Sequence, residues 1–88
     1  MRSFKDENGR EWIATALEEE TPRHHGRWYL VFHPEGEADA VFPIPEVRWQ
    51  TQETAERTLR TMSETELRRR LNTARLRSPS LDATRNDG

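Results

Sequence analysis

The chain has 88 residues, of which 32% are hydrophobic and 34% charged, with a net charge of -2 and no cysteine. This size predicts one domain with a small core, because such a domain buries only about 60% of the surface that its unfolded chain exposes. The lack of cysteine excludes disulfides, thiolate zinc sites and thiol catalysis, and no apolar run approaches the roughly 18 residues of a membrane span.

The first predicted element is a β-hairpin centred on Asn8-Gly9. This dipeptide favours a two-residue type I′ turn, because both central residues of that turn need a positive φ. Such a turn would place Phe4 opposite Ile13. We expect the second strand over residues 12–17 and its end in solvent at residues 18–20, which are three glutamates. Its alternation is too weak to predict which side is buried.

The clearest strand is predicted over residues 27–33, where the middle is continuously apolar. Such a run is typical of a central strand buried on both faces. A short strand over residues 40–42 follows. Pro43 and Pro45 place this strand at an edge of the sheet, because proline cannot donate to the ladder. We expect residues 43–49 to form an extended crossover to the helices.

Two helices are predicted in the second half of the chain. Thr51 fits the N-cap of the first. Ser63 and Glu66 fit a capping box that begins the second, and Ser78-Pro79 ends it. The apolar stripes at helical spacing are Ala55, Leu59 and Met62 for the first helix, and Leu67, Leu71 and Ala74 for the second.

Four Glu-to-Arg pairs at i to i+4 spacing run along these helices. That spacing puts opposite charges one turn apart, with Glu toward the N-terminal end, which is the better orientation. These pairs account for most of a basic run that would otherwise resemble a nucleic-acid site. They are Glu53/Arg57, Glu56/Arg60, Glu64/Arg68 and Glu66/Arg70.

The order of the elements, strands first and helices second, predicts an α+β fold. We expect a small antiparallel meander of three or four strands over residues 3–44. Two short helices over residues 52–77 would pack on one face of this sheet. Residues 1–78 would form a single domain and residues 79–88 a disordered C-terminal tail.

No pattern in the sequence indicates catalysis, a metal or another cofactor. His24 and His25 are adjacent, so their side chains would diverge in an extended loop, and His33 would end a strand at the surface. The serines lie outside any nucleophile elbow, and the glycines match no phosphate-binding loop. We therefore expect a protein that is not an enzyme and that has no catalytic residue, no metal site and no cofactor.

The predicted function is protein binding, either to a partner protein or to a second copy. Two helices cover only one face of a sheet, so the other face would keep apolar strand residues in solvent, which usually marks a protein contact. The sequence leaves open whether the uncovered set is Tyr29, Val31 and His33 or Trp28, Leu30 and Phe32. Three arginines that the four Glu-to-Arg pairs leave free would steer an acidic partner. The predicted protein-binding residues are Tyr29, Val31, His33, Arg69, Arg75 and Arg77.

Nucleic-acid binding is the alternative, because charge is unevenly spread along the chain. Residues 1–56 hold six basic and twelve acidic residues, whereas residues 57–88 hold eight and four. Arginines on the last helix could contact phosphates, and strand aromatics could stack on bases. The isoelectric point near 5.9 argues against this alternative. Residues 1–6 lack the apolar stretch of a signal peptide, so a cytoplasmic location away from membranes is expected.

Overall fold

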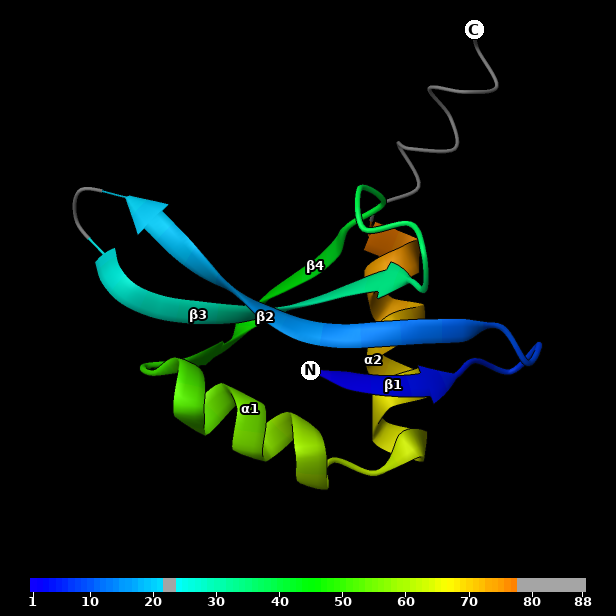
Figure 1. The fold of residues 1–88 in the computed structure, drawn as a ribbon. Helices are drawn as coiled ribbons and strands as arrows, with labels where there is room; N and C mark the ends of the chain where they lie inside the picture. Colours follow the sequence, from blue (N-terminus) through cyan, green and yellow to red (C-terminus); the bar gives the residue numbers. More distant parts are fainter. Residues whose placement is uncertain (22–23, 78–88) are drawn as a thin grey trace, which may run out of the picture.

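The computed structural model describes residues 1–21 and 24–77 of the chain. It contains a four-stranded antiparallel sheet followed by two helices, so the predicted α+β fold is confirmed (Figure 1). Strand order follows the chain, which makes the sheet a meander. The predicted tail over residues 79–88 lies outside the described residues. The elements are β1 (Arg2–Lys5), β2 (Glu11–Thr21), β3 (His24–Pro34), β4 (Phe42–Trp49), α1 (Gln52–Thr61) and α2 (Glu64–Arg77).

The turn between β1 and β2 is not the predicted type I′ turn. Gly9 has a φ of +84°, but among the described residues only glycines have a positive φ, so Asn8 does not adopt the required conformation. The amide of Gly9 donates to the carbonyl of Asp6 (3.0 Å), and the amide of Asp6 donates to the carbonyl of Arg10 (2.9 Å). These bonds close a three-residue loop, a type I turn followed by a glycine bulge.

The side chain of Asp6 explains the longer loop. Its Oδ1 accepts the amide N–H groups of Asn8 (2.8 Å) and Arg10 (2.9 Å), which holds the backbone in this turn. The register therefore pairs Phe4 with Trp12, and the predicted pairing of Phe4 with Ile13 is wrong. A shift of one residue exchanges the two faces of a strand, so this register decides which side chains enter the core.

β2 and β3 are the longest strands of the sheet, and they pair with each other. β2 continues through its three glutamates to Thr21, so the prediction that it ends at residue 17 is wrong. β3 lies between β2 and β4, as its apolar middle predicted. Leu30, Val31 and Phe32 are all at most 1% exposed.

β4 lies at the edge of the sheet, as its prolines predicted. Its bounds differ from the prediction, because the strand covers residues 42–49 rather than 40–42. The segment predicted as an unpaired crossover, residues 43–49, is therefore most of the strand itself. Pro43 and Pro45 are tolerated because β4 has a partner on one side only, in the described part of the chain.

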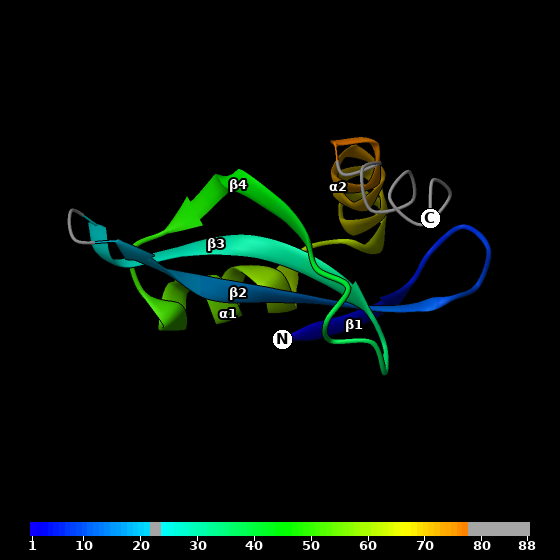
Figure 2. The same cartoon turned by 90° about the horizontal axis from the view of Figure 1, so that it is seen from above.

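A bulge bends β4 in the middle. Residues 45–47 have no partner on β3. The side-chain Nε of Arg48 donates to the carbonyl of Pro45 (2.6 Å), closing the bulge. Figure 2 shows the resulting bend in the ribbon. The partners on either side of the bulge are Leu30↔Ile44 and Tyr29↔Arg48.

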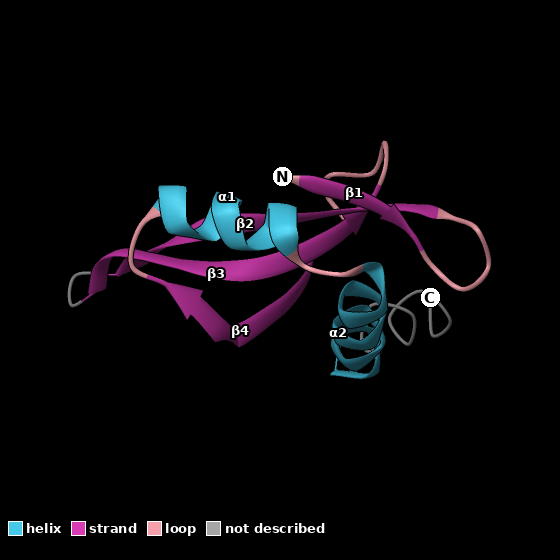
Figure 3. Cartoon of the chain, turned by 90° about the horizontal axis from the view of Figure 1, so that it is seen from below, coloured by secondary structure: helices cyan, strands magenta, loops and turns pink. Residues whose placement is uncertain are grey.

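Both helices pack on one face of the sheet, as predicted. α1 contacts β2, β3 and β4, whereas α2 contacts β4 and β1. Figure 3, seen from below, shows α1 in front of β2 and β3, with α2 beside β4. The predicted apolar stripes of both helices are buried between the helices and the sheet, with Met62 only partly buried. The core consists of Phe4, Trp12, Ala14, Leu30, Phe32, Ile44, Leu59, Leu67, Leu71 and Ala74.

Thr51 and Ser63 cap the two helices as predicted. Each hydroxyl oxygen accepts the amide N–H of the third residue after it, at 3.1 Å. The carboxylate of Glu66 pairs with Arg69 (3.4 Å) and Arg70 (2.8 Å), so ion pairs take the place of the return bond of the capping box.

Candidate functional site

The face of the sheet opposite the helices is open in the part of the chain that the structure describes. Figure 2, seen from above, shows β2 and β3 in front of α1, with no helix over them. Ala14 and Ala16 of β2 pair with Phe32 and Leu30 of β3, and these four residues are buried on the helix side. Because side chains alternate along a strand, the odd-numbered residues within 11–19 of β2 and within 27–33 of β3 point to the open face.

The middle of this open face is apolar. Leu17 is 41% exposed, which is high for a large aliphatic side chain, and its partner across the strands is Tyr29. Val31 lies on the same face but is only 1% exposed. Its partners in register are Thr15 and Pro43, and its side chain offers a partner almost no surface. The partly exposed members of the open face are Ile13, Thr15, Tyr29, His33 and Pro43.

Oppositely charged residues lie at the two ends of the open face. At one end Lys5 of β1 pairs in register with Glu11 of β2. At the other end Glu19 of β2 pairs in register with Arg27 of β3. Arg48 of β4 adds an ion pair to Glu19, with 3.4 Å between Nη1 and Oε1. Each end therefore carries both signs of charge.

The three arginines predicted to steer a partner are on α2, on the helix side of the sheet. Each has an acidic neighbour. Arg69 pairs with Glu66 (3.4 Å), Arg75 lies 3.8 Å from Asp6, and Arg77 pairs with Glu46. The prediction that these arginines are left without a partner is wrong, and they do not share a surface with Tyr29 and His33.

Three of the four predicted ion pairs along the helices form. Their N–O distances are 3.7 Å for Glu53–Arg57, 2.8 Å for Glu64–Arg68 and 2.8 Å for Glu66–Arg70. Glu56 instead binds the N-terminal ammonium group of Met1, at 2.6 Å. Most of the basic charge of the helices is thus matched by carboxylates in the same structure.

Two carboxylates have a lowered pKa. Burial of Asp6 would raise its pKa, but hydrogen bonds from Arg10, Trp12 and Asn8 and the charge of Arg75 outweigh this effect. The hydrogen bond from Arg77 lowers the pKa of Glu46. Both carboxylates are therefore ionised at neutral pH, which suits ion pairing rather than proton donation.

The structure offers no metal cluster within its described residues, where no three His, Cys, Asp or Glu side chains come together. The side chains of His24 and His25 lie outside the described ones, and Nδ1 of His33 donates to the carbonyl of Pro34 (2.9 Å). None of the described helices is both long and apolar enough to cross a membrane.

Sequence reasoning missed the main apolar residues of the open face, Ile13, Leu17 and Pro43. The signal that identifies them is the pair of alanines at 14 and 16. Small residues at alternate positions let a helix approach that side, so their neighbours must face away from it. Comparisons with protein-family models, curated proteins and solved structures found no match for this chain.

Proposed function

We propose that this protein is a small non-catalytic interaction module that binds a second copy of itself through the open face of its sheet. The observation that carries the proposal is the exposure of Leu17 beside Tyr29, opposite a face that two helices cover. Apolar surface concentrated on one face is typical of a protein contact. Aromatic residues such as Tyr29 are enriched among those that dominate contact energies.

The charges of the open face favour a second copy over a highly charged partner. Each end of the face carries both an acidic and a basic residue, so a strongly acidic or basic partner would meet repulsion as well as attraction. A copy related by a two-fold axis brings the same mixed charges and the same apolar middle. The pairs that provide this balance are Lys5 with Glu11, and Glu19 with Arg27 and Arg48.

Sheet-on-sheet packing gives this dimer its geometry. Two sheets that stack face to face lie roughly 10 Å apart, with strand directions within about 30° of each other. Leu17 and Tyr29, which pair across β2 and β3, would interdigitate with those of the other copy near the axis. His33 and Pro43 would lie around this centre.

Light scattering coupled to size-exclusion chromatography tests the proposal. The wild-type protein is expected at twice the chain mass at high concentration and at a lower apparent mass on dilution. Leu17→Lys should shift the protein to the monomer, because a buried ammonium without a partner is costly. Leu76→Lys is the matched control, since Leu76 is 79% exposed on α2 and away from the open face.

Two results would contradict the proposal. One is a wild-type protein that has the mass of a single chain at every concentration. The other is a dimer that Leu17→Lys leaves intact or that Leu76→Lys disrupts. Circular dichroism of both variants confirms that each is folded before its mass is compared.

Nucleic-acid binding has less support, because Arg69, Arg75 and Arg77 each lie beside a carboxylate. A phosphate would have to displace the carboxylate that pairs with Arg69 or with Arg77. A gel-shift assay at low salt distinguishes the two functions, since binding by the arginines would weaken steeply as salt rises. A complex of this kind that forms with the monomeric Leu17→Lys variant would favour the nucleic-acid alternative.

A further inference from the structure

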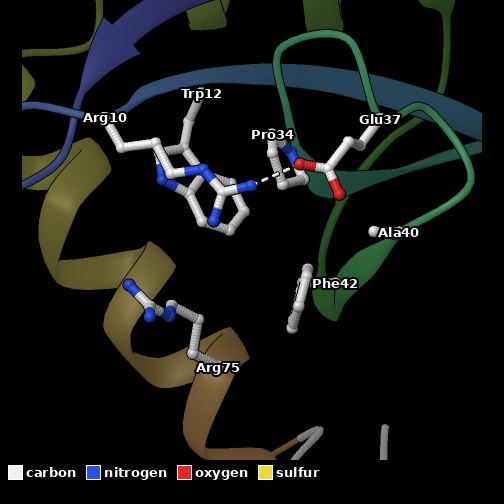
Figure 4. Close-up of a pocket in the computed structure, with 7 residues that line it drawn as sticks. All are labelled: Arg10, Trp12, Pro34, Glu37, Ala40, Phe42 and Arg75. Atoms are coloured by element: carbon white, nitrogen blue, oxygen red, sulfur yellow. Dashed lines mark hydrogen bonds and ion pairs between the residues drawn. The ribbon is translucent and has the colours of Figure 1, made fainter. Parts of the chain in front are cut away.

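A pocket of about 420 Å³ lies on the helix side of the sheet, away from the open face. This volume falls within the roughly 300–1,000 Å³ of small-molecule sites. Figure 4 shows that its side chains come from the β1–β2 loop, β2, β3, the β3–β4 loop, β4 and α2. The lining residues are Arg10, Trp12, Pro34, Glu37, Ala40, Phe42 and Arg75.

The floor of the pocket is a fixed aromatic pair. Trp12 is only 2% exposed, and its indole N–H donates to Oδ2 of Asp6 at 2.8 Å. Phe42 meets the indole edge to face, with 5.6 Å between ring centroids and 70° between ring planes. The indole is thus held by Asp6 at its N–H and by Phe42 at its ring.

Two guanidinium groups approach the same indole ring from different elements. The Cζ atoms of Arg10 and Arg75 each lie 5.5 Å from the centroid of the Trp12 ring. Such contacts are attractive, because the face of an aromatic ring carries negative charge. They also bring two like charges to the same ring, which neighbouring carboxylates offset.

The two arginines are neutralised to different extents. Arg10 donates to the carboxylate of Glu37 across the pocket (Figure 4). The nearest carboxylate oxygen to Arg75 within the described residues is Oδ2 of Asp6, at 3.8 Å. That distance exceeds a hydrogen bond, so the N–H groups of Arg75 keep their capacity to donate to a ligand.

From this geometry we infer that the pocket binds a small monocarboxylate with a flat apolar body, held by Arg75 and Arg10 against Phe42. Arginine donates to a carboxylate through two parallel N–H groups. The side chain of Glu37 already places a carboxylate next to Arg10. A carboxylate group therefore fits at this position of the pocket. The two arginines face two carboxylates, Asp6 and Glu37, which leaves little net charge and favours a monoanion over a phosphate.

Nuclear magnetic resonance titration with phenylacetate tests the inference. The indole N–H signal of Trp12 and the Nε–H signals of Arg10 and Arg75 should shift with a single millimolar affinity. Acetate supplies the charge without the ring, and 2-phenylethanol supplies the ring without the charge. Both should bind more weakly than phenylacetate, and so should inorganic phosphate.

Two variants assign the binding to these residues. Arg75→Gln should lower the affinity for phenylacetate about tenfold, the loss expected for one charged hydrogen bond. Glu37→Gln should raise it up to about fivefold, because an exposed ion pair no longer competes for Arg10. Arg69→Gln is the matched control on the same helix, since Arg69 pairs with Glu66 outside the pocket.

Three results would overturn the inference. They are an unchanged Trp12 signal at saturating phenylacetate, a phosphate affinity equal to that of phenylacetate, and a Glu37→Gln variant with weaker binding. The last remains decisive if Arg75→Gln fails to fold, because Glu37 is an exposed loop residue. None of these outcomes depends on whether the open face forms a dimer.

Discussion

At the residue scale, Asp6 connects the first turn of the sheet to the core. It is only 9% exposed, and both of its carboxylate oxygens are used. Oδ1 accepts two backbone amides of its own turn, and Oδ2 accepts the indole N–H of Trp12. One side chain therefore fixes the turn, the register of β1 and the orientation of the largest core residue.

The first prediction concerns the loss of this carboxylate. Asp6→Asn keeps the size of the side chain but presents an amide N–H₂ where one oxygen now accepts a hydrogen bond. We expect a loss of about 1–3 kcal/mol in the free energy of unfolding, measured by urea denaturation. Asp39→Asn, in an exposed loop, is the control and should change little. Equal stability of the two variants would contradict the role of Asp6.

The second prediction is a loss of stability in acid. The pKa of folded Asp6 lies below its unfolded value of about 3.9. Its stabilising effect is therefore complete above that pH and disappears as the pH falls through the folded pKa. The urea midpoint of the wild-type protein should fall below about pH 4. Asp6→Asn should show a smaller fall, and a parallel pH dependence of both proteins would disprove this assignment.

At the scale of elements, the edges of the sheet are protected. The carbonyl of Lys5 on β1 accepts a hydrogen bond from Arg68 of α2 (2.9 Å). β4 carries two prolines and a bulge, which prevent regular pairing with another strand. Past Ala14, β2 has no strand partner on this side among the described residues, and Glu18 there would repel the Glu18 of a second copy. Self-association through an edge is therefore disfavoured relative to the open face.

α2 is held to the sheet by its apolar stripe rather than by its ion pairs. Leu71 is fully buried, whereas Leu76 on the same helix is 79% exposed. The third prediction is that Leu71→Ala lowers the free energy of unfolding by about 2–5 kcal/mol. Leu76→Ala should change it by less than about 0.5 kcal/mol. Similar values for the two variants in urea denaturation would show that α2 is not part of the cooperative core.

Local signals in the sequence predicted the helices well. The caps formed by Thr51 and Ser63 and the two apolar stripes involve residues only a few positions apart in the sequence. Spacing alone is therefore enough to locate the helices. The edge position of β4 was also predictable, because proline limits hydrogen bonding wherever the strand lies. The open face was predictable as a consequence of having two helices and one sheet, but its apolar members on β2 were not.

The errors arose where contacts between distant or competing groups decide the structure. Asp6 accepts hydrogen bonds from the backbone of its own turn, so the loop is not the type I′ turn that Asn8-Gly9 predicted. β2 continues through its glutamates because Glu19 lies opposite Arg27 of β3 and forms an ion pair with Arg48 of β4. Arg77 meets Glu46 across the fold. Spacing along a helix does not reveal such partners.

At the scale of the whole molecule, the two sides of the sheet differ in chemistry. The helix side holds the core, the ion pairs of α2 and the pocket at Trp12. The other side holds the partly exposed Leu17 and Tyr29 between mixed charges, and none of the described helices covers it. This asymmetry is the basis for assigning the contact with a second copy to the open side and ligand binding to the helix side.

A dilution series followed by nuclear magnetic resonance tests the central proposal most directly, because it reports which surface changes with concentration. The signals of Ile13, Leu17 and Tyr29 should move together as the protein is concentrated, while those of Leu76 and the buried Leu71 stay in place. Signals of the open face that keep one position over the whole range, or movement confined to α2, would contradict it.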